Sequence, residues 1–281
     1  MRRIFICLLL FALACAPSVS DADARRAASL NEQGLAKFQQ SAFPRALQLF
    51  LDAKQLNPAE AEYANNVGMA YLRMGELGPA ATPINEAIAL SPDRPLYHYN
   101  QGLTFIAGQD REMATAAFLK AVELDKDYFD ANAYLGLLLY EAGRFEDAAR
   151  HWENASATRD NAEIESNLGM TYLALGDLEA AEKTLLRATA IDPEYGLAHY
   201  NLGVLYQQTE QFEKAEASYN QTKRLTPHKF ETYFNLGIVQ TKLGKPAEAR
   251  RSLEEFLSQA PPQMTQQIQD TPIVTARRRR H

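Results

Sequence analysis

Cysteine and tryptophan are scarce in this chain, whose 281 residues include two cysteines and one tryptophan. Both cysteines, Cys7 and Cys15, lie close to the N-terminus, so the rest of the chain cannot form a disulfide or a thiolate metal site. An excess of basic residues is also lacking, because 35 acidic residues face 29 lysines and arginines. These shortages exclude a disulfide-stapled fold and argue against nucleic-acid binding, which needs excess positive charge.

Motifs for catalysis and cofactor binding are missing as well. The sequence has no Gly-rich phosphate loop, no His-Glu-x-x-His pair and no strand-borne nucleophile elbow. His98 and His199 occupy one recurring position of the repeat described below, which favours a packing role, and His151 has no companion at metal-ligand spacing. We therefore expect no enzyme activity, no cofactor and no metal site.

The N-terminus carries the pattern of an export signal. Residues 1–3 are Met-Arg-Arg, and residues 4–16 are an apolar run too short to span a membrane as an ordinary helix. This pattern matches the charged and apolar regions of a signal peptide, which we predict for residues 1–16. The expected destination of the chain is therefore outside the cytoplasm.

Cys15 offers a specific cleavage site. The preceding residues, Ala-Leu-Ala, resemble a bacterial lipobox with Ala in place of the usual first Leu. That resemblance implies cleavage before Cys15 and lipidation of this cysteine. The alternative is ordinary signal-peptidase cleavage after Ala16 or Ser20, which would leave the mature chain without a lipid.

Glycine and alanine recur in two columns that organise most of the sequence. Each of seven glycines, spaced 33 or 34 residues apart, is followed twelve residues later by an alanine. The glycines are Gly34, Gly68, Gly102, Gly136, Gly169, Gly203 and Gly237, and the alanines are Ala46, Ala80, Ala114, Ala148, Ala181, Ala215 and Ala249. Such a period indicates a repeat array, and small residues at fixed points let two helices approach closely.

Large apolar residues flank both columns at helical spacing, so each repeat is predicted to be a pair of helices. Position 15 holds a glycine in four repeats, where a left-handed residue can end the first helix. Position 32 is proline in five repeats, and proline cannot continue the second helix. Counted from seven residues before each column glycine, the seven units are 27–60, 61–94, 95–128, 129–161, 162–195, 196–229 and 230–263.

This pattern resembles the tetratricopeptide repeat (TPR) family, most clearly in residues 61–71 and 198–206. The resemblance covers residues 27–263. It implies an all-α, right-handed superhelical solenoid of about seven antiparallel helix hairpins. It also implies a non-catalytic surface that binds other proteins, since the family supplies binding surfaces for many pathways.

The flanks and one junction depart from the repeat. Residues 17–26 lack a periodic apolar face and are predicted to be a tether, while residues 264–281 are predicted to form a C-terminal cap and a disordered basic tail. Repeat 4 is one residue short and lacks its proline, which makes its junction with repeat 5 a candidate hinge. Residues 27–263 contain 21 basic and 32 acidic residues, so we expect no nucleic acid at the array.

The candidate binding residues lie on the first helices. Position 6 is asparagine in five repeats, and the resemblance implies that these amides face a concave groove and hold the backbone of an extended ligand. The alternative is that they bond only to neighbouring helices. The family's concave positions are 2, 5, 9, 12 and 13, and here they carry mostly apolar side chains. The predicted groove residues are Asn66, Asn100, Asn167, Asn201, Asn235, Met69, Tyr99, Leu103, Met170, Tyr200, Val204, Phe234 and Ile238.

The expected function is a protein–protein interaction scaffold of the bacterial cell envelope. The chain resembles exported TPR lipoproteins of pilus and secretion systems of the Tad/Flp or type IV kind, which implies a periplasmic location and a lipid anchor in the outer membrane. The implied partners are envelope proteins, bound through an apolar groove, and the membrane, reached through the N-terminal lipid. The alternative function is an adaptor of a periplasmic cell-wall enzyme.

Overall fold

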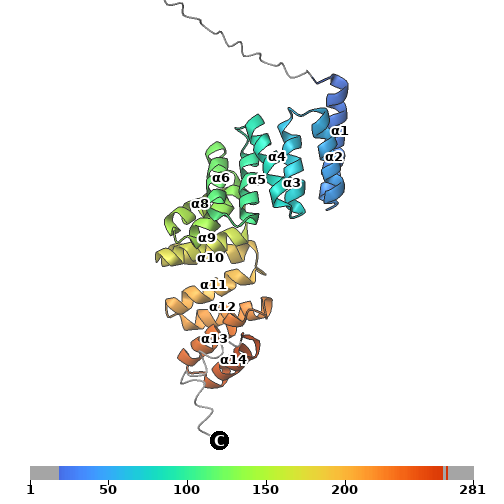
Figure 1. Cartoon of the computed structure of the whole chain (residues 1–281). Coiled ribbons are helices and arrows are strands. Elements are labelled where there is room, and N and C mark those ends of the chain that lie inside the picture. Colours follow the sequence, from blue (N-terminus) through green and yellow to red (C-terminus); the bar gives the residue numbers. More distant parts are fainter. Residues whose placement is uncertain (1–18, 262–263, 265–281) are drawn as a thin grey trace, which may run out of the picture. The chain divides into compact units, whose positions relative to one another are not determined.

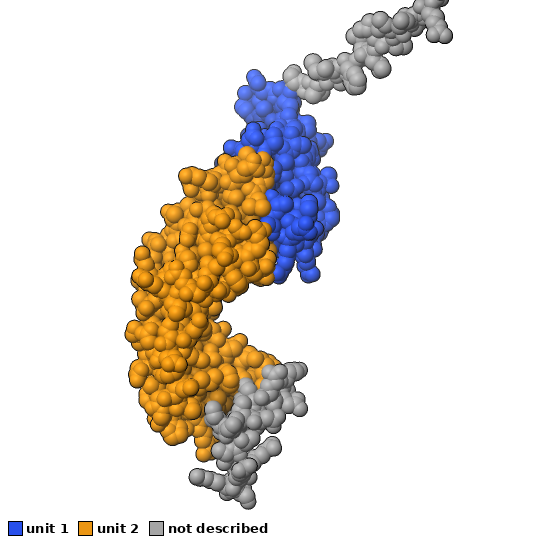
Figure 2. Space-filling view, turned by 90° about the vertical axis from the view of Figure 1, so that its left-hand side faces the viewer, with its two compact units in different colours: residues 1–117 blue, residues 118–281 orange. Residues whose placement is uncertain are grey.

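The computed structural model of the chain describes residues 19–261 and Met264, and every regular element in this part is an α-helix (Figure 1). The chain divides into two compact units, Met1–Ala117 and Phe118–His281 (Figure 2). The boundary falls inside helix α6 (Arg111–Leu124). Within the described residues, no helix has the length and hydrophobicity needed to cross a membrane.

The helices on either side of α6 come in consecutive pairs. Unit 1 contains α1 (Asp21–Gln39), α2 (Phe43–Leu56), α3 (Ala61–Arg73), α4 (Leu77–Leu90) and α5 (Pro95–Ala107). Unit 2 contains α7 (Phe129–Glu141), α8 (Phe145–Thr158), α9 (Ala162–Leu175), α10 (Leu178–Ile191), α11 (Gly196–Gln208), α12 (Phe212–Leu225), α13 (Phe230–Lys242) and α14 (Pro246–Gln259).

Packing within each unit follows the predicted hairpins. The two helices of a repeat pack together, as α3 with α4 and α11 with α12 do, and the second helix packs on the first helix of the next repeat. First helices of successive repeats also touch, as in α9 with α11. The prediction of an all-α array of helix hairpins is therefore confirmed, and the first helices form a continuous layer within each unit.

The glycine column permits the close approach of the two helices in one repeat. A Cβ atom added to Gly203 would lie 2.5 Å from the ring of Tyr219, and one added to Gly136 would lie 2.5 Å from the Trp152 ring. The large side chain of the second helix thus occupies the space that a side chain at the glycine would need. The alanine column is buried in every repeat. Both columns are packing positions, as the sequence pattern indicated.

The turn inside each hairpin uses a left-handed residue at position 15. The predicted glycines have φ between 70° and 79°, at Gly75, Gly143, Gly176 and Gly244. The other three repeats place Ser41, Gln109 and Glu210 there, with φ of 58°, 61° and 57°. A left-handed conformation costs roughly 1–2 kcal/mol for a residue with a Cβ. The hairpin geometry therefore overrides local preference in these three repeats.

The predicted tether needs a correction, because helix α1 begins at Asp21 and residues 21–26 are helical. Ser20 caps the helix: its hydroxyl oxygen accepts a 3.1 Å hydrogen bond from the backbone N–H of Asp23. Asp21 and Asp23 in the first turn also interact favourably with the helix dipole. Capping and helix propensity thus extend the helix although this stretch has no apolar face.

A polar cluster lies at the junction of repeats 4 and 5. The side chain of Glu165 is 2% exposed and accepts a hydrogen bond from the Ser156 hydroxyl. Arg187 forms an ion pair with Glu165 at 3.1 Å and another with Asp160 at 2.8 Å. The cluster links α8, α9, α10 and the connection after α8, at the place where most other repeats have a proline.

Several predicted segments fall outside the described residues. They include the signal peptide (1–16) with Cys15 and nearly all of the C-terminal cap and basic tail (264–281), of which Met264 alone is described.

Candidate functional site

The asparagine column forms a ladder of hydrogen bonds between repeats. In four cases the position-6 amide donates to the side chain at position 5 of the preceding repeat, 35 residues earlier. The pairs are Asn66 to Asn31 at 2.8 Å, Asn100 to Asn65 at 2.7 Å, Asn201 to Ser166 at 2.9 Å and Asn235 to Tyr200 at 3.1 Å. Of the two roles considered for the column, bonding between helices therefore accounts for one N–H of each of these four amides.

Burial supports this structural role for part of the ladder. Asn100 is 3% exposed and Asn201 is 4% exposed, while Asn66 and Asn235 are half-buried. An unpaired buried amide is costly, and the ladder avoids this cost by giving each one a partner. These four side chains consequently have less of their amide left for a ligand than the sequence suggested.

Asn167 departs from the ladder. Position 5 of the preceding repeat is Ala133, which lies 34 residues before Asn167. The side chain of alanine has no polar atom and cannot accept a hydrogen bond. The side chain of Asn167 is half-buried and makes no hydrogen bond to any residue that the structure describes. Its donors and its acceptor are therefore free to meet a ligand or water.

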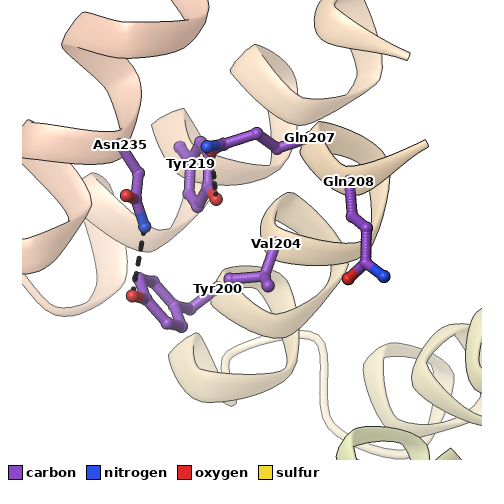
Figure 3. A pocket seen from close by; sticks show the side chains of 6 residues that line it. All are labelled: Tyr200, Val204, Gln207, Gln208, Tyr219 and Asn235. Atoms are coloured by element: carbon purple, nitrogen blue, oxygen red, sulfur yellow. Dashed lines mark hydrogen bonds between the residues drawn. The ribbon is translucent and has the colours of Figure 1, made fainter. Parts of the chain in front are cut away.

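One pocket of about 380 Å³ lies in unit 2 against helix α11 (Figure 3). Its lining comes from α11, α12 and α13 and combines two tyrosine rings, one valine and three amide side chains. The lining residues are Tyr200, Val204, Gln207, Gln208, Tyr219 and Asn235. The wall is partly fixed, because the Tyr200 hydroxyl accepts from Asn235 at 3.1 Å and the Tyr219 hydroxyl donates to Gln207 at 2.9 Å.

The electrostatics of this pocket keep its hydroxyls neutral. Burial raises the pKa of the Tyr200 hydroxyl, and burial likewise raises the pKa of Tyr219. Both remain protonated near neutral pH and so can donate hydrogen bonds. The ammonium of Lys229 lies 4.3 Å from the centre of the Tyr200 ring. The pocket therefore offers neutral donors and acceptors beside one aromatic face that a cation covers.

A second pocket of about 290 Å³ lies in unit 2 among α7, α8, α9 and α11. Its lining is mainly apolar and aromatic. The lining residues are Leu137, Tyr140, Glu141, Trp152, Asn167, Met170, Leu197 and Asn201. Leu137 is 42% exposed, which is high for a leucine in the middle of a helix. This pocket brings the free amide of Asn167 next to an accessible apolar surface.

The two pockets occupy matching places in the repeat. Both use positions 9, 12, 13 and 24 of one repeat and the position-6 asparagine of the next. Eight lining residues were not among the predicted groove residues: Leu137, Tyr140, Glu141, Trp152, Leu197, Gln207, Gln208 and Tyr219. Six of them stand at the concave positions 2, 9, 12 and 13 of the TPR resemblance, which could have pointed to them. Trp152 and Tyr219 stand at position 24 of the second helix, which the sequence pattern marks as a packing position.

Only some of the predicted groove residues line one of the two pockets. Tyr200, Val204 and Asn235 line one pocket, and Asn167, Met170 and Asn201 line the other. The remaining seven line neither of these two pockets: Asn66, Asn100, Met69, Tyr99, Leu103, Phe234 and Ile238. The ring of Phe234 packs against Phe256, with centroids 5.3 Å apart. Packing within repeat 7 thus uses part of a side chain that was assigned to the groove.

The described titratable side chains were compared with the requirements of a metal site and with the linings of the two pockets. No group of three or more His, Cys, Asp and Glu side chains in residues 19–261 is placed to hold a metal ion. The two pockets contain one carboxylate between them, at Glu141. Their chemistry suits recognition by apolar contact and neutral hydrogen bonds.

Comparison with known proteins agrees with the repeat geometry. Models described as "Tetratricopeptide repeat" match residues 31–95, 99–163 and 202–280, and one described as "TPR repeat" matches residues 169–210. The chain belongs to the tetratricopeptide repeat family. Members of this family generally act as non-catalytic scaffolds for protein–protein interaction, and the chain has the corresponding fold.

Individual relatives are distant. RNA polymerase II-associated protein 3 of Rattus norvegicus is 26% identical over 193 residues, which are 64% of this chain and 29% of that protein. The chain spans no more than 29% of the length of each of five curated relatives that it matches. The match to these relatives therefore concerns the repeat alone and a minor part of their length.

Two solved structures have the same fold over most of the chain. PilW, described as a "widely conserved type IV pilus biogenesis factor", has a TM-score of 0.59 and 16% identity, covering 77% of this chain and 97% of PilW. YrrB, described as "a TPR protein with an unusual peptide-binding site", has a TM-score of 0.58 and 18% identity, covering 71% of this chain and all of YrrB. At these identities the likeness concerns the fold alone.

Proposed function

We propose that the chain is a non-catalytic scaffold of the bacterial cell envelope that binds an extended segment of a partner protein along the first helices of unit 2. Assembly of a pilus or secretion system is the process we assign to it. The mature chain is proposed to reside in the periplasm, held at the outer membrane by a lipid on Cys15. The partner's apolar side chains enter the two pockets, and neutral amides position its backbone.

The observation that carries the binding part of this proposal is the repeated pocket. Two cavities recur at matching positions of repeats 4 and 6, as expected for a surface that binds an extended chain at several points. Apolar walls supply affinity, while a few fixed polar groups supply orientation. Both linings consist mainly of apolar, aromatic and neutral amide side chains, so apolar and uncharged polar groups are the preferred ligands.

The envelope part of the proposal has separate support. Residues 1–16 have the pattern of a signal peptide, and PilW, which has the same fold, is described as a pilus biogenesis factor. The competing proposal is an adaptor of a periplasmic cell-wall enzyme, since the same signal and fold suit both. The identity of the bound partner separates the two.

Site-specific photo-crosslinking in cells tests the binding surface. A photoreactive amino acid replaces Leu137 in the pocket or, as a matched control, Leu186 on α10, which is 46% exposed. We expect a discrete crosslinked partner from position 137 and none from position 186. Equal crosslinking from both positions, or no crosslinking from position 137, would contradict the proposed groove.

Mass spectrometry of the mature N-terminus tests the anchor. The expected result is a mature chain that begins at an acylated Cys15. Several acyl chains on this residue would hold the protein firmly at a membrane, whereas a single chain would hold it only marginally. A mature chain that begins unmodified at Pro17 or Asp21 would overturn the lipid anchor and leave a soluble periplasmic scaffold.

A further inference from the structure

The polar cluster between repeats 4 and 5 is built around one cation. Arg187 on α10 forms ion pairs with Glu165 on α9 at 3.1 Å and with Asp160, in the connection after α8, at 2.8 Å. It also donates a 3.4 Å hydrogen bond to the hydroxyl oxygen of Ser156 on α8, and that hydroxyl in turn donates to Glu165. We name Ser156, Asp160, Glu165 and Arg187 the Arg187 cluster. It joins three helices and one connection within unit 2.

The cluster replaces a link that two other junctions make in the same place. There, a lysine at position 28 forms an ion pair with a glutamate at position 26 of the next repeat. The pairs are Lys54–Glu86 at 2.5 Å and Lys223–Glu255 at 2.6 Å. At the junction of repeats 4 and 5, position 28 is Ser156 and position 26 is Arg187. The cation thus stands on the later repeat and takes its carboxylates from Glu165, which is 2% exposed, and from Asp160.

Two further links are missing at this junction. Four other connections between repeats close with a backbone hydrogen bond from their fourth residue to their first: 57–60, 125–128, 192–195 and 226–229. Residues 159–161, all of which the structure describes, make no such bond. Asn167 on α9 also makes none of the ladder's hydrogen bonds to α7. Between the described helices of repeats 4 and 5, the side-chain bonds are therefore those of the Arg187 cluster and an exposed hydrogen bond from Tyr172 to Glu153.

The second pocket spans the same junction. Leu137 lines it from α7 of repeat 4, and Met170 lines it from α9 of repeat 5. Trp152 lines it from α8, four residues before Ser156, so both side chains lie on the same face of that helix. One helix therefore carries a wall of the pocket and a member of the Arg187 cluster. A shift of α8 against α9 would move that wall.

We propose that Arg187 is a positioning residue for this pocket, although it does not line it: its ion pairs hold α8 against α9 and α10 and thereby fix the width of the cavity. Without these pairs, mainly the packing of α8 on α9 resists motion, and residues 159–161 absorb the rotation. The junction then opens as a hinge and the Trp152 wall moves. This inference goes beyond the proposed function, because it holds whether or not a partner binds.

A paired substitution tests the role of the ion pair. Arg187→Met alone would leave a buried carboxylate without a cation, which lowers stability for a separate reason. Combined with Glu165→Gln, it removes both charges and leaves an acceptor for Ser156. The matched control combines Lys223→Met with Glu255→Gln and removes the ion pair between repeats 6 and 7, neither partner of which lines the pocket. Circular dichroism and thermal unfolding show whether each variant keeps the helical fold.

Trp152 provides a local measurement of the pocket. It is the only tryptophan of the 281 residues and is 3% exposed, so quenching of the intrinsic fluorescence by acrylamide reports on the accessibility of this wall. We expect the quenching constant to rise by roughly twofold or more in the Glu165→Gln, Arg187→Met chain, because opening exposes a buried ring. The control chain should keep the native quenching constant.

Spin-label distances provide a measurement of the hinge. The labels are attached to cysteines that replace exposed residues of the full chain, in which Cys7 and Cys15 are changed to serine. One pair, at Glu146 on α8 and Glu213 on α12, spans the junction of repeats 4 and 5. The other pair, at Glu179 on α10 and Ala247 on α14, spans the two following junctions.

The expected result is local. In the Glu165→Gln, Arg187→Met chain, the distance distribution from 146 to 213 should broaden or shift, while that from 179 to 247 stays as in the native chain. Native quenching and native distances in this variant would overturn the positioning role. Equal changes in the control chain would also overturn it, since loss of any such ion pair would then loosen a junction. Broadening of both label pairs in the test variant would mean a general loss of packing and would contradict a hinge at this junction.

Discussion

The side-chain amide of Asn201 donates a 2.9 Å hydrogen bond to the hydroxyl of Ser166, which lies on the first helix of the preceding repeat. Both side chains are buried, and the contact joins α9 to α11. Equivalent bonds join α1 to α3, α3 to α5 and α11 to α13, whereas Asn167 on α9 makes no such bond to α7. From α9 to α13, the first helices that line the pockets are therefore held in register by polar contacts as well as by the glycine and alanine columns.

Loss of one of these hydrogen bonds between repeats should lower the stability of the chain measurably. Ser166→Ala leaves the buried Asn201 amide without its acceptor, which should lower the free energy of unfolding by about 1–2 kcal/mol. Urea unfolding of the full chain measures the loss. Asn220→Ala, at an exposed position of α12, serves as the control and should change stability by less than about 0.5 kcal/mol. Equal behaviour of the two variants would show that the ladder is not stabilising.

A side chain added at a glycine of the column should lower stability more than one added at a glycine with free space around it. In Gly203→Ala the new methyl group meets the Tyr219 ring at 2.5 Å, so the helices must separate, at a cost of roughly 1–3 kcal/mol. Gly78→Ala is the control, since nothing lies within 4 Å of its added Cβ. That change should be neutral or stabilising by up to about 1 kcal/mol, because alanine favours the helix. Thermal unfolding gives the comparison, and matching midpoints would contradict the packing role.

The left-handed turns offer a stabilising substitution. Glu210 has φ of 57°, and Glu210→Gly should raise stability by about 0.5–1 kcal/mol because glycine adopts this conformation without strain. Gly176→Ala, at the equivalent turn with φ of 79°, should lower stability by about 1 kcal/mol. Chemical unfolding of both variants decides the point. Destabilisation by Glu210→Gly would mean that the glutamate side chain contributes more than its backbone strain costs.

Histidine protonation should make the chain less stable in mild acid. Burial lowers the pKa of His151, and Arg150 lowers it further, so the folded state holds the ring neutral against the Asn132 carbonyl at 2.9 Å. The unfolded chain binds the proton more readily, so stability falls as the pH drops through about 6.5. His151→Gln should reduce the difference in thermal midpoint between pH 7.5 and 5.5. Asn220→Ala, a change at an exposed and non-titratable residue of α12, should leave that difference as it is in the native chain.

Much of the repeat could be predicted because its determinants are local or strictly periodic. Gly203 and Tyr219 lie sixteen residues apart, and the same pairing of a glycine with a large side chain recurs in successive repeats. The left-handed glycines, such as Gly176, follow from helix-ending chemistry alone. These signals need no knowledge of how neighbouring repeats are placed, so the sequence alone revealed the hairpins.

The site was harder to predict because its polar contacts cross between repeats. The free amide of Asn167 looks identical in sequence to the bonded amide of Asn201, and the difference arises from which residues face them. Phe234 fits the groove pattern equally well, yet its ring contacts Phe256. The start of α1 was missed because a cap at Ser20 extended a helix that apolar periodicity does not mark.

The central claim is that a partner protein binds the pocketed surface of unit 2, and a matched pair of substitutions tests it most directly. Leu137→Glu places a charge in the pocket, while Leu186→Glu places the same charge on α10 at similar exposure. Calorimetric titration with the partner identified by crosslinking should show at least about tenfold weaker binding for Leu137→Glu, since a desolvated carboxylate is costly there. Leu186→Glu should bind like the native chain, and both variants should keep the native helical circular dichroism. Equal affinities for the two variants would contradict the account.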